Sequence, residues 1–263
     1  NSLENGSAKE GIDGAPAVEF CSAALRYKGS AEPALSNVTF KAMRGETIGI
    51  IGGTGSGKTS LVNLIPRFYD TDSGCVKVNG VNVREYDIDS LRRKIGVVPQ
   101  KAVLFKGTIA SNLRWGSEDA SERDMESAVG TAQASEVVNG KDNGYDAYVA
   151  QGGSNFSGGQ RQRLTIARAL VKDPEILILD DSASALDFAT DANLRKAIRE
   201  LPSNPTVFVV SQRTASVMNA DRIIVLDDGE PVGIGTHEEL LDSCEVYSEI
   251  YYSQFPKEAA VNG

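Results

Sequence analysis

The stretch that decides the fold is Gly52-Gly53-Thr54-Gly55-Ser56-Gly57-Lys58-Thr59. It fits the phosphate-loop pattern G-x-x-x-x-G-K-[ST] at every defined position. The apolar run before it, residues 47–51, has the composition of a buried strand, and residues 60–65 after it have that of a helix. A chance glycine turn would lack these flanks. Strand, glycine-rich loop and helix in this order form a cradle for phosphate groups.

Each residue type in this loop has a chemical reason. Backbone N–H groups converge on the α- and β-phosphates of a nucleotide only where no Cβ intervenes, which accounts for Gly52, Gly55 and Gly57. Lys58 is expected to reach the β- and γ-phosphates, and the Thr59 hydroxyl to ligate Mg²⁺. The same nucleotide is expected to touch Gly53, Thr54, Ser56 and Ser60. The sequence therefore predicts a site for ATP with Mg²⁺.

The composition is that of an ordinary soluble globular domain. The chain has 263 residues, of which 41% are hydrophobic and 24% charged. No stretch approaches the ~18 to 20 apolar residues of a membrane span. The net charge of −9 disfavours electrostatic binding along the phosphate backbone of a nucleic acid, so we expect no nucleic-acid partner. Cys21, Cys75 and Cys244 fit neither metal-ligand spacing nor a disulfide framework and are expected to be packed thiols.

The chain divides by composition into a leader, a core and a tail. Residues 1–17 are rich in Gly, Ser, Ala and acidic side chains, so we expect a linker from an upstream part of the protein. The fold is expected to run from Val18 to Phe255, with residues 256–263 frayed. Two turn pairs between alternating apolar stretches predict hairpins, Asn79-Gly80 and Asp228-Gly229.

A helical lobe is expected over about residues 101–170. Within it, one segment carries its apolar residues at helical spacing behind a capping Ser121. Its apolar face is Met125, Ala128, Val129 and Ala132.

Two further motifs belong to nucleotide chemistry. Residues 175–180 form an apolar run ending in Asp180, as a central parallel strand does when its carboxylate meets Mg²⁺ through water. The tetrad Ser157-Gly158-Gly159-Gln160 opens the helical residues 161–170. A serine-capped helix start of this kind presents free N–H groups and a hydroxyl to an anion.

With the phosphate loop, these motifs make the chain resemble the nucleotide-binding domain of ATP-binding cassette (ABC) transporters, most closely bacterial multidrug and lipid exporters of the half-transporter kind. The resemblance covers nearly the whole chain, from about Val18 to Phe255. It implies an α/β fold: a P-loop NTPase core with a mixed central sheet, an antiparallel β subdomain and a helical lobe. It also implies ATP hydrolysis at the cytoplasmic face of the cell membrane, beneath a transmembrane domain of the same transporter.

The resemblance implies roles for single residues. Tyr27 is expected to stack on adenine, although a strand aromatic packed in the core is the plainer alternative. Gln100 completes the Mg²⁺ shell with Thr59 and Asp180. In this family two domains pair head to tail, so that Ser157 to Gln160, the signature motif, closes on the ATP of the partner domain.

Two positions depart from the family pattern at the γ-phosphate end of the site. The family has Glu after the Walker B aspartate, where this chain has Asp181, one methylene shorter. A displacement of about 1 Å at a reacting group costs on the order of a hundredfold in rate. The family has His in the switch loop, where this chain has Gln212, whose amide donates a hydrogen bond but takes no part in proton transfer. Gln151 also replaces a Glu just before the signature motif.

An intact phosphate loop and signature motif beside Asp181 and Gln212 resemble the degenerate half of heterodimeric exporters. Such a half binds ATP with little turnover and completes the competent site of a different chain. The alternatives are a complete homodimeric exporter ATPase that uses Asp181 as its base, an importer subunit, and an ABC ATPase acting on DNA or the ribosome. The last class carries coiled-coil insertions, zinc fingers or basic arms, which this sequence does not show.

Overall fold

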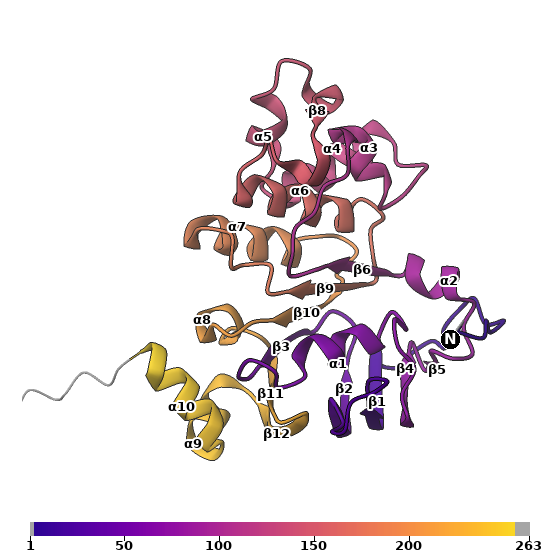
Figure 1. The fold of residues 1–263 in the computed structure, drawn as a ribbon, viewed down its shortest axis with the longest axis vertical. Helices are drawn as coiled ribbons and strands as arrows, with labels where there is room; N and C mark the ends of the chain where they lie inside the picture. Colours follow the sequence, from indigo (N-terminus) through magenta and orange to yellow (C-terminus); the bar gives the residue numbers. More distant parts are fainter. Residues whose placement is uncertain (1–2, 256–263) are drawn as a thin grey trace, which may run out of the picture. The chain divides into compact units, whose positions relative to one another are not determined.

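The computed structural model describes residues 3–255, which form two compact units (Figure 1). The first unit comprises residues 3–88 and 208–255 of the described chain, and the second comprises residues 89–207. The tail predicted at residues 256–263 lies outside the described residues. No helix within residues 3–255 is long and apolar enough to cross a membrane.

An antiparallel sheet forms one part of the first unit, with strand order β2-β1-β4-β5 (Figure 1). Strand β1 (Val18–Leu25) buries alternate side chains on either side of a break in register beside Cys21, with Val18 and Phe20 before it and Ala23 and Leu25 after it. Phe20 on β1 stacks on Phe40 of β2 at a ring distance of 4.7 Å. The remaining strands are β2 (Leu35–Ala42), β4 (Ser73–Val78) and β5 (Val81–Asn82). The hairpin predicted at Asn79-Gly80 is confirmed, because β4 and β5 pair antiparallel across it.

A mixed sheet forms the other part of the first unit. Strand β3 (Thr47–Ile51) pairs parallel with β11 (Arg222–Asp227), which pairs antiparallel with β12 (Glu230–Gly235). The second predicted hairpin, at Asp228-Gly229, is thereby confirmed. The helices of this unit are α1 (Lys58–Leu64), α8 (Thr214–Val217), α9 (His237–Ser243) and α10 (Glu245–Gln254).

The segment before β1 lies along the first unit. Ala8 forms a parallel bridge with Tyr86, and the amide of Gly6 donates to the Tyr86 carbonyl at 3.0 Å. A Cβ on Gly6 would lie 2.1 Å from the carbonyl oxygen of Glu85, so only glycine allows this approach. The sequence pattern gave no signal for these main-chain bonds, because they depend on backbone groups and not on side chains.

The second unit packs helices around α6 (Gly158–Leu170), which contacts α3 (Ile109–Arg114) and α4 (Glu122–Thr131) (Figure 1). The helix predicted behind Ser121 is confirmed as α4, with a capping box between Ser121 and Asp124. Two parallel strands, β6 (Ile95–Val98) and β9 (Ile176–Asp180), pair in this unit, and all of β9 is buried. The other elements are α2 (Ile88–Arg93), β7 (Gly107–Thr108), α5 (Ser135–Asn139), η1 (Gly144–Asp146), β8 (Tyr148–Val149), η2 (Gln151–Gly153), α7 (Phe188–Arg199) and β10 (Thr206–Val210), which runs on into the first unit.

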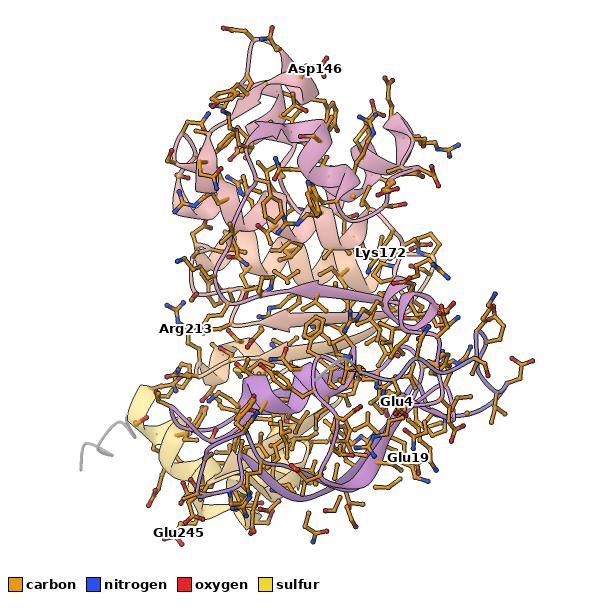
Figure 2. All side chains as sticks on the ribbon, turned by 45° about the vertical axis from the view of Figure 1, so that its right-hand side comes forward. Glu4, Glu19, Asp146, Lys172, Arg213 and Glu245 are labelled. Atoms are coloured by element: carbon orange, nitrogen blue, oxygen red, sulfur yellow. The ribbon has the colours of Figure 1, made fainter. Side chains whose placement is uncertain are left out.

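A half-buried lysine follows α6 and predicts a pH dependence of stability. Lys172, labelled in Figure 2, donates to the Arg92 carbonyl at 2.8 Å, and burial lowers its pKa from 10.5 to about 8. Between pH 8 and 10.5 the unfolded chain binds more protons than the folded chain, so the free energy of unfolding rises with pH there. Lys172→Met should raise the unfolding free energy by about 2 kcal/mol at pH 7, with a gain that shrinks above pH 8.

Denaturant melts of both proteins at pH 7 and pH 10 would check this expectation. Lys196→Met is the control, because Lys196 is exposed on α7 and should change stability by less than about 0.5 kcal/mol. If the difference in unfolding free energy between Lys172→Met and wild type were equal at both pH values, the lowered pKa would not be its cause.

Candidate functional site

The phosphate loop of the first unit lies between β3 and α1, as predicted. Its backbone enters the left-handed region at Gly55 and Gly57, with φ of 84° and 94°. Two close approaches make glycine necessary. A Cβ on Gly52 would lie 2.1 Å from the Leu226 carbonyl oxygen, and one on Gly57 would lie 2.6 Å from that of Ala34. The loop conformation is therefore held by the fold around it.

Lys58 holds the loop from inside. Its side chain is buried, and its Nζ donates to the Gly52 carbonyl at 2.9 Å, the Gly53 carbonyl at 2.5 Å and the Ser56 hydroxyl at 3.3 Å. A Cβ added at Gly53 or Gly55 would meet no atom within 4 Å. The open side of the loop thus has room for a ligand, with an ammonium group beneath it. These residues fit a phosphate chain, and the exposed Thr59 beside them offers a hydroxyl suited to Mg²⁺.

Tyr27 lies beside the start of α1. Its hydroxyl donates to the Ser60 Oγ at 2.9 Å, and its ring meets that of Tyr69 edge-on at 5.0 Å. The Tyr27 side chain is half-buried, so part of it remains open to solvent. The structure therefore brings Tyr27 to the phosphate-loop helix, and its stacking on adenine remains a prediction.

Gln212 follows β10 in an exposed segment that α10 holds in place. The side-chain amide of Gln254 donates to the Gln212 carbonyl at 2.8 Å and accepts from the Thr214 amide at 2.8 Å. The backbone on both sides of residue 213 is thus bound by one side chain. The local sequence pattern of α10 gives no signal for this role of Gln254, because its partners lie far away in the chain.

Gln254→Ala should loosen this segment. Loss of the bond from the Thr214 amide should speed its hydrogen exchange about fivefold, since a neutral hydrogen bond contributes about 1 kcal/mol. Gln254→Glu is the matched variant, because its carboxylate still accepts from the Thr214 amide but donates nothing to the Gln212 carbonyl. Equal Thr214 exchange in wild type and Gln254→Ala would rule out this role.

The second unit contains the two predicted carboxylates in sequence. Asp180 ends β9 and is 6% exposed, and Asp181 follows with φ of 46° in the left-handed region. Asp tolerates this region better than most residues. The Gln100 amide lies 3.4 Å from the Asp181 carboxylate, so the structure brings these two predicted residues together.

The signature motif starts α6 with a complete capping box. The Ser157 hydroxyl accepts from the Gln160 amide at 3.2 Å, and the Gln160 side chain accepts from the Ser157 amide at 2.9 Å. A Cβ on Gly159 would lie 3.2 Å from the Ala185 carbonyl oxygen, whereas one on Gly158 would meet nothing within 4 Å. This chain's own packing therefore does not require glycine at position 158.

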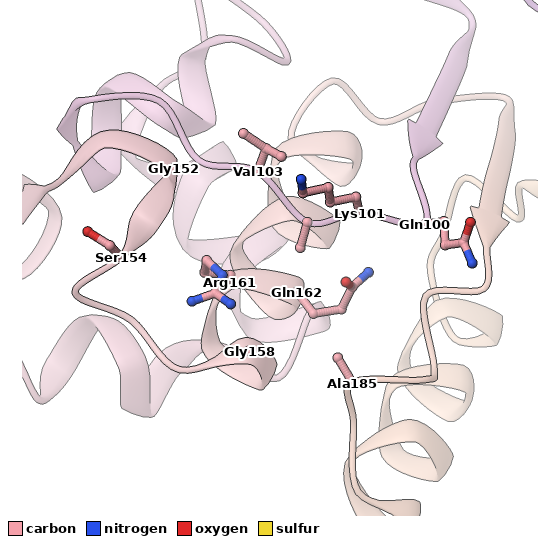
Figure 3. Close-up of a pocket in the computed structure, with 10 residues that line it drawn as sticks. Gln100, Lys101, Val103, Gly152, Ser154, Gly158, Arg161, Gln162 and Ala185 are labelled. Carbon is pink, nitrogen blue, oxygen red and sulfur yellow. The ribbon is translucent and has the colours of Figure 1, made fainter.

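A pocket of about 570 Å³ lies beside this helix start in the second unit (Figure 3). It is lined by Gln100, Lys101, Ala102, Val103, Gly152, Ser154, Gly158, Arg161, Gln162 and Ala185. Gln162 is buried, and its amide nitrogen has no hydrogen-bond partner among the described residues. Sequence reasoning missed Gln162, because it follows the signature motif without belonging to it. Within residues 3–255, no group of three or more His, Cys, Asp or Glu residues is placed to hold a metal ion.

A buried strand, a glycine loop shaped by its surroundings and a lysine held inside that loop define a P-loop nucleotide-binding protein. Comparison with known families identifies which one. The family model described as "ABC transporter" matches residues 35–184, more than half of the chain. The chain belongs to the ABC transporter family, and it is an ATP-binding domain of the ATP-hydrolysing type. The predicted fold class is confirmed.

Known relatives agree with this assignment. An uncharacterized ABC transporter ATP-binding protein, YfiB of Bacillus subtilis, is 44% identical over 98% of this chain and 44% of its own length. The ATP-dependent lipid A-core flippase of Vibrio vulnificus is 42% identical over 87% of this chain and 40% of its own length. A solved structure, of a bacterial Atm1-family ABC exporter with ATP bound, superimposes with a TM-score of 0.88 at 31% identity, over 96% of this chain and 44% of the exporter chain. The chain thus spans less than half the length of these relatives.

Proposed function

We propose that this chain is the ATPase domain of an ABC exporter that works at the cytoplasmic face of a membrane, beneath a transmembrane domain of the same transporter. Its similarity to a lipid flippase and to an Atm1-family exporter supports an export function. The single observation that best supports ATP binding is the geometry of the phosphate loop. The Lys58 ammonium group lies inside the loop, and the outer side of the loop is open to a ligand.

The same proposal gives each predicted residue a role. Residues 52–60 bind the phosphates, with Tyr27 against the adenine. The Thr59 hydroxyl, Gln100 and Asp180 would hold Mg²⁺, which supplies charge neutralisation for phosphoryl transfer when bound. These assignments rest on residue types and on the family resemblance.

The chain's own site is proposed to be degenerate. Asp181 has a short side chain, and its carboxylate lies 3.4 Å from the Gln100 amide. Gln212 donates and accepts hydrogen bonds, but it carries no group that titrates near neutral pH. Both residues can therefore form hydrogen bonds that orient the nucleotide or a water molecule. Neither is suited to accept the proton of an attacking water. Slow turnover follows.

The signature motif is proposed to act on the ATP of a second nucleotide-binding domain, most simply on a different chain. Alanine at position 158 would meet no neighbour and would suit a helix better, yet the chain has glycine there. A ligand from outside the chain that approaches the helix start would explain this choice. The Ser157 hydroxyl and the free N–H groups of the first turn suit a phosphate.

The pocket beside α6 is proposed to receive a segment of the transmembrane domain. It combines an exposed apolar residue, Val103, with polar groups from Gln100 and Arg161. The orphaned Gln162 amide offers a buried donor to a main-chain carbonyl of such a segment.

ATP binding and turnover by the purified chain test the proposal. We expect MgATP binding with turnover well below one per second, since the site lacks both a suited base and a partner domain. Lys58→Met is the binding control, because loss of a charged hydrogen-bond donor should weaken MgATP binding about tenfold to hundredfold.

The result also separates the competing functions. Turnover of tens per second by the pure chain would contradict degeneracy and favour the complete homodimeric ATPase. Failure of both proteins to bind MgATP would contradict the proposed ATPase itself.

A further inference from the structure

A pair of cysteines outside the candidate site faces solvent on the antiparallel sheet of the first unit. Cys21 on β1 and Cys75 on β4 are direct cross-strand partners. Both are half-buried free thiols, whereas Cys244 is buried. All three cysteines are free thiols, as expected, but only Cys244 is fully packed.

The register of the sheet places both side chains on one face. Val18, Phe20, Val76 and Val78 point into the core, so the alternate positions, including 21 and 75, point outward. Glu19, labelled in Figure 2, shares this outward face and forms an ion pair with Lys77 at 3.3 Å.

Backbone geometry fixes the distance between the two cysteines. Directly paired residues on antiparallel strands have Cα atoms about 4.5 or 5.5 Å apart, depending on the kind of pair, and both values suit a disulfide. Gly74 tightens this approach, because a Cβ there would lie 2.3 Å from the Cys21 carbonyl oxygen. The strands are thus held together beside the thiols.

The chemical surroundings act on the thiols in two directions. Burial, a hydrogen bond with the Cys75 thiol and the nearby charges of Cys75 and Glu19 raise the pKa of Cys21, while Lys77 favours its thiolate. The cross-strand pairing places the two thiols side by side, and the Lys77 ammonium group lies close enough to act on Cys21. A charge on Cys75 opposes ionisation of Cys21, so the two thiols react in sequence.

We propose that Cys21 and Cys75 form a redox-responsive dithiol that closes to an intrachain disulfide by exchange with a small-molecule disulfide. One cysteine thiolate attacks a sulfur of the small disulfide, breaks its S–S bond and releases one small thiol. The second cysteine thiolate attacks the mixed disulfide so formed and releases the other. The two cysteine sulfurs lose two electrons in total, the small disulfide gains them, and the two cysteine protons end on the released thiols.

Closure would restrain the nucleotide-binding part of the chain. The disulfide would close the loop from residue 21 to residue 75, which contains Tyr27 and the whole phosphate loop. Closing a loop of this length lowers the conformational entropy of the unfolded chain and so stabilises the folded chain. Oxidation should raise the melting temperature by about 5 to 10 °C. This effect does not depend on the proposed ATPase function.

The test is incubation of the folded chain with oxidised glutathione, followed by alkylation and peptide mapping. We expect two thiols per chain to disappear without a retained glutathione, and one cross-linked peptide pair to contain Cys21 and Cys75. Cys75→Ser should instead retain one glutathione on Cys21, and Cys75→Ala serves if the serine variant does not fold. Cys244→Ser should behave as wild type.

Three outcomes would overturn the inference: glutathione adducts retained on both cysteines, cross-links between chains, and thiols that stay reduced. A melting temperature that is the same for oxidised and reduced protein would overturn the proposed restraint. Because the map is made on the unaltered chain, the inference does not rely on any variant being stable.

Discussion

Ser157→Arg is expected to abolish ATP hydrolysis by the assembled transporter while leaving MgATP binding to this chain nearly unchanged. The Ser157 hydroxyl and the helix start behind it are proposed to stabilise charge on the partner's ATP. Removing one such donor costs about a hundredfold to a thousandfold in rate. Arginine also adds bulk in the open space over Gly158. Turnover of the complex and nucleotide binding by the isolated variant would measure the two effects separately.

The same serine caps α6, so the loss of the cap needs its own control. Ser157→Arg breaks the capping box with Gln160, at a cost of about 1 kcal/mol in stability. Ser121→Arg breaks the equivalent box on α4 and should leave turnover intact. Ser157→Asp keeps a good cap but places a negative charge against phosphate. Inactive Ser157→Asp with active Ser121→Arg is the expected pattern, and full turnover by Ser157→Arg would refute the assignment.

The ATP-binding machinery was accessible from the sequence because its parts are local. The phosphate loop, Asp180 after a buried strand and the Ser157 cap each occupy a few adjacent residues, and the structure shows each in its expected local form. Turn pairs such as Asp228-Gly229 were readable for the same reason, since left-handed backbone demands those residue types.

What the sequence did not reveal depends on residues that are distant in the chain. Gln254 meets residues 212 and 214 only because α10 returns to that segment. Cys21 and Cys75 become partners through the register of β1 and β4, which cannot be predicted from the sequence of either strand alone. The left-handed backbone at Asp181 was also hidden, because Asp occurs in many conformations.

Asp181→Glu combined with Gln212→His is expected to raise turnover at this chain's own site on the order of a hundredfold. The glutamate extends the carboxylate by one methylene toward an attacking water, and the histidine returns a group that titrates near neutral pH. If the two residues act as one unit, the gain in turnover from the double change should exceed the combined gains from the two single changes. Glutamate fits the left-handed backbone at position 181 less well, so a loss of about 1 kcal/mol in stability should accompany the gain.

The chain's intact signature motif allows this prediction to be tested without an identified partner. Two copies of the repaired chain pairing head to tail would each complete the other's site, so turnover should rise more than linearly with protein concentration. Adding Ser157→Arg to the repaired chain should remove this activity, because neither copy then offers a working signature motif. Mixing that inactive chain with wild type should restore it, since wild type supplies the motif and the repaired chain supplies the carboxylate and the imidazole. If the double variant stays as slow as wild type at every concentration while still binding MgATP, residues 181 and 212 are not what silences this site.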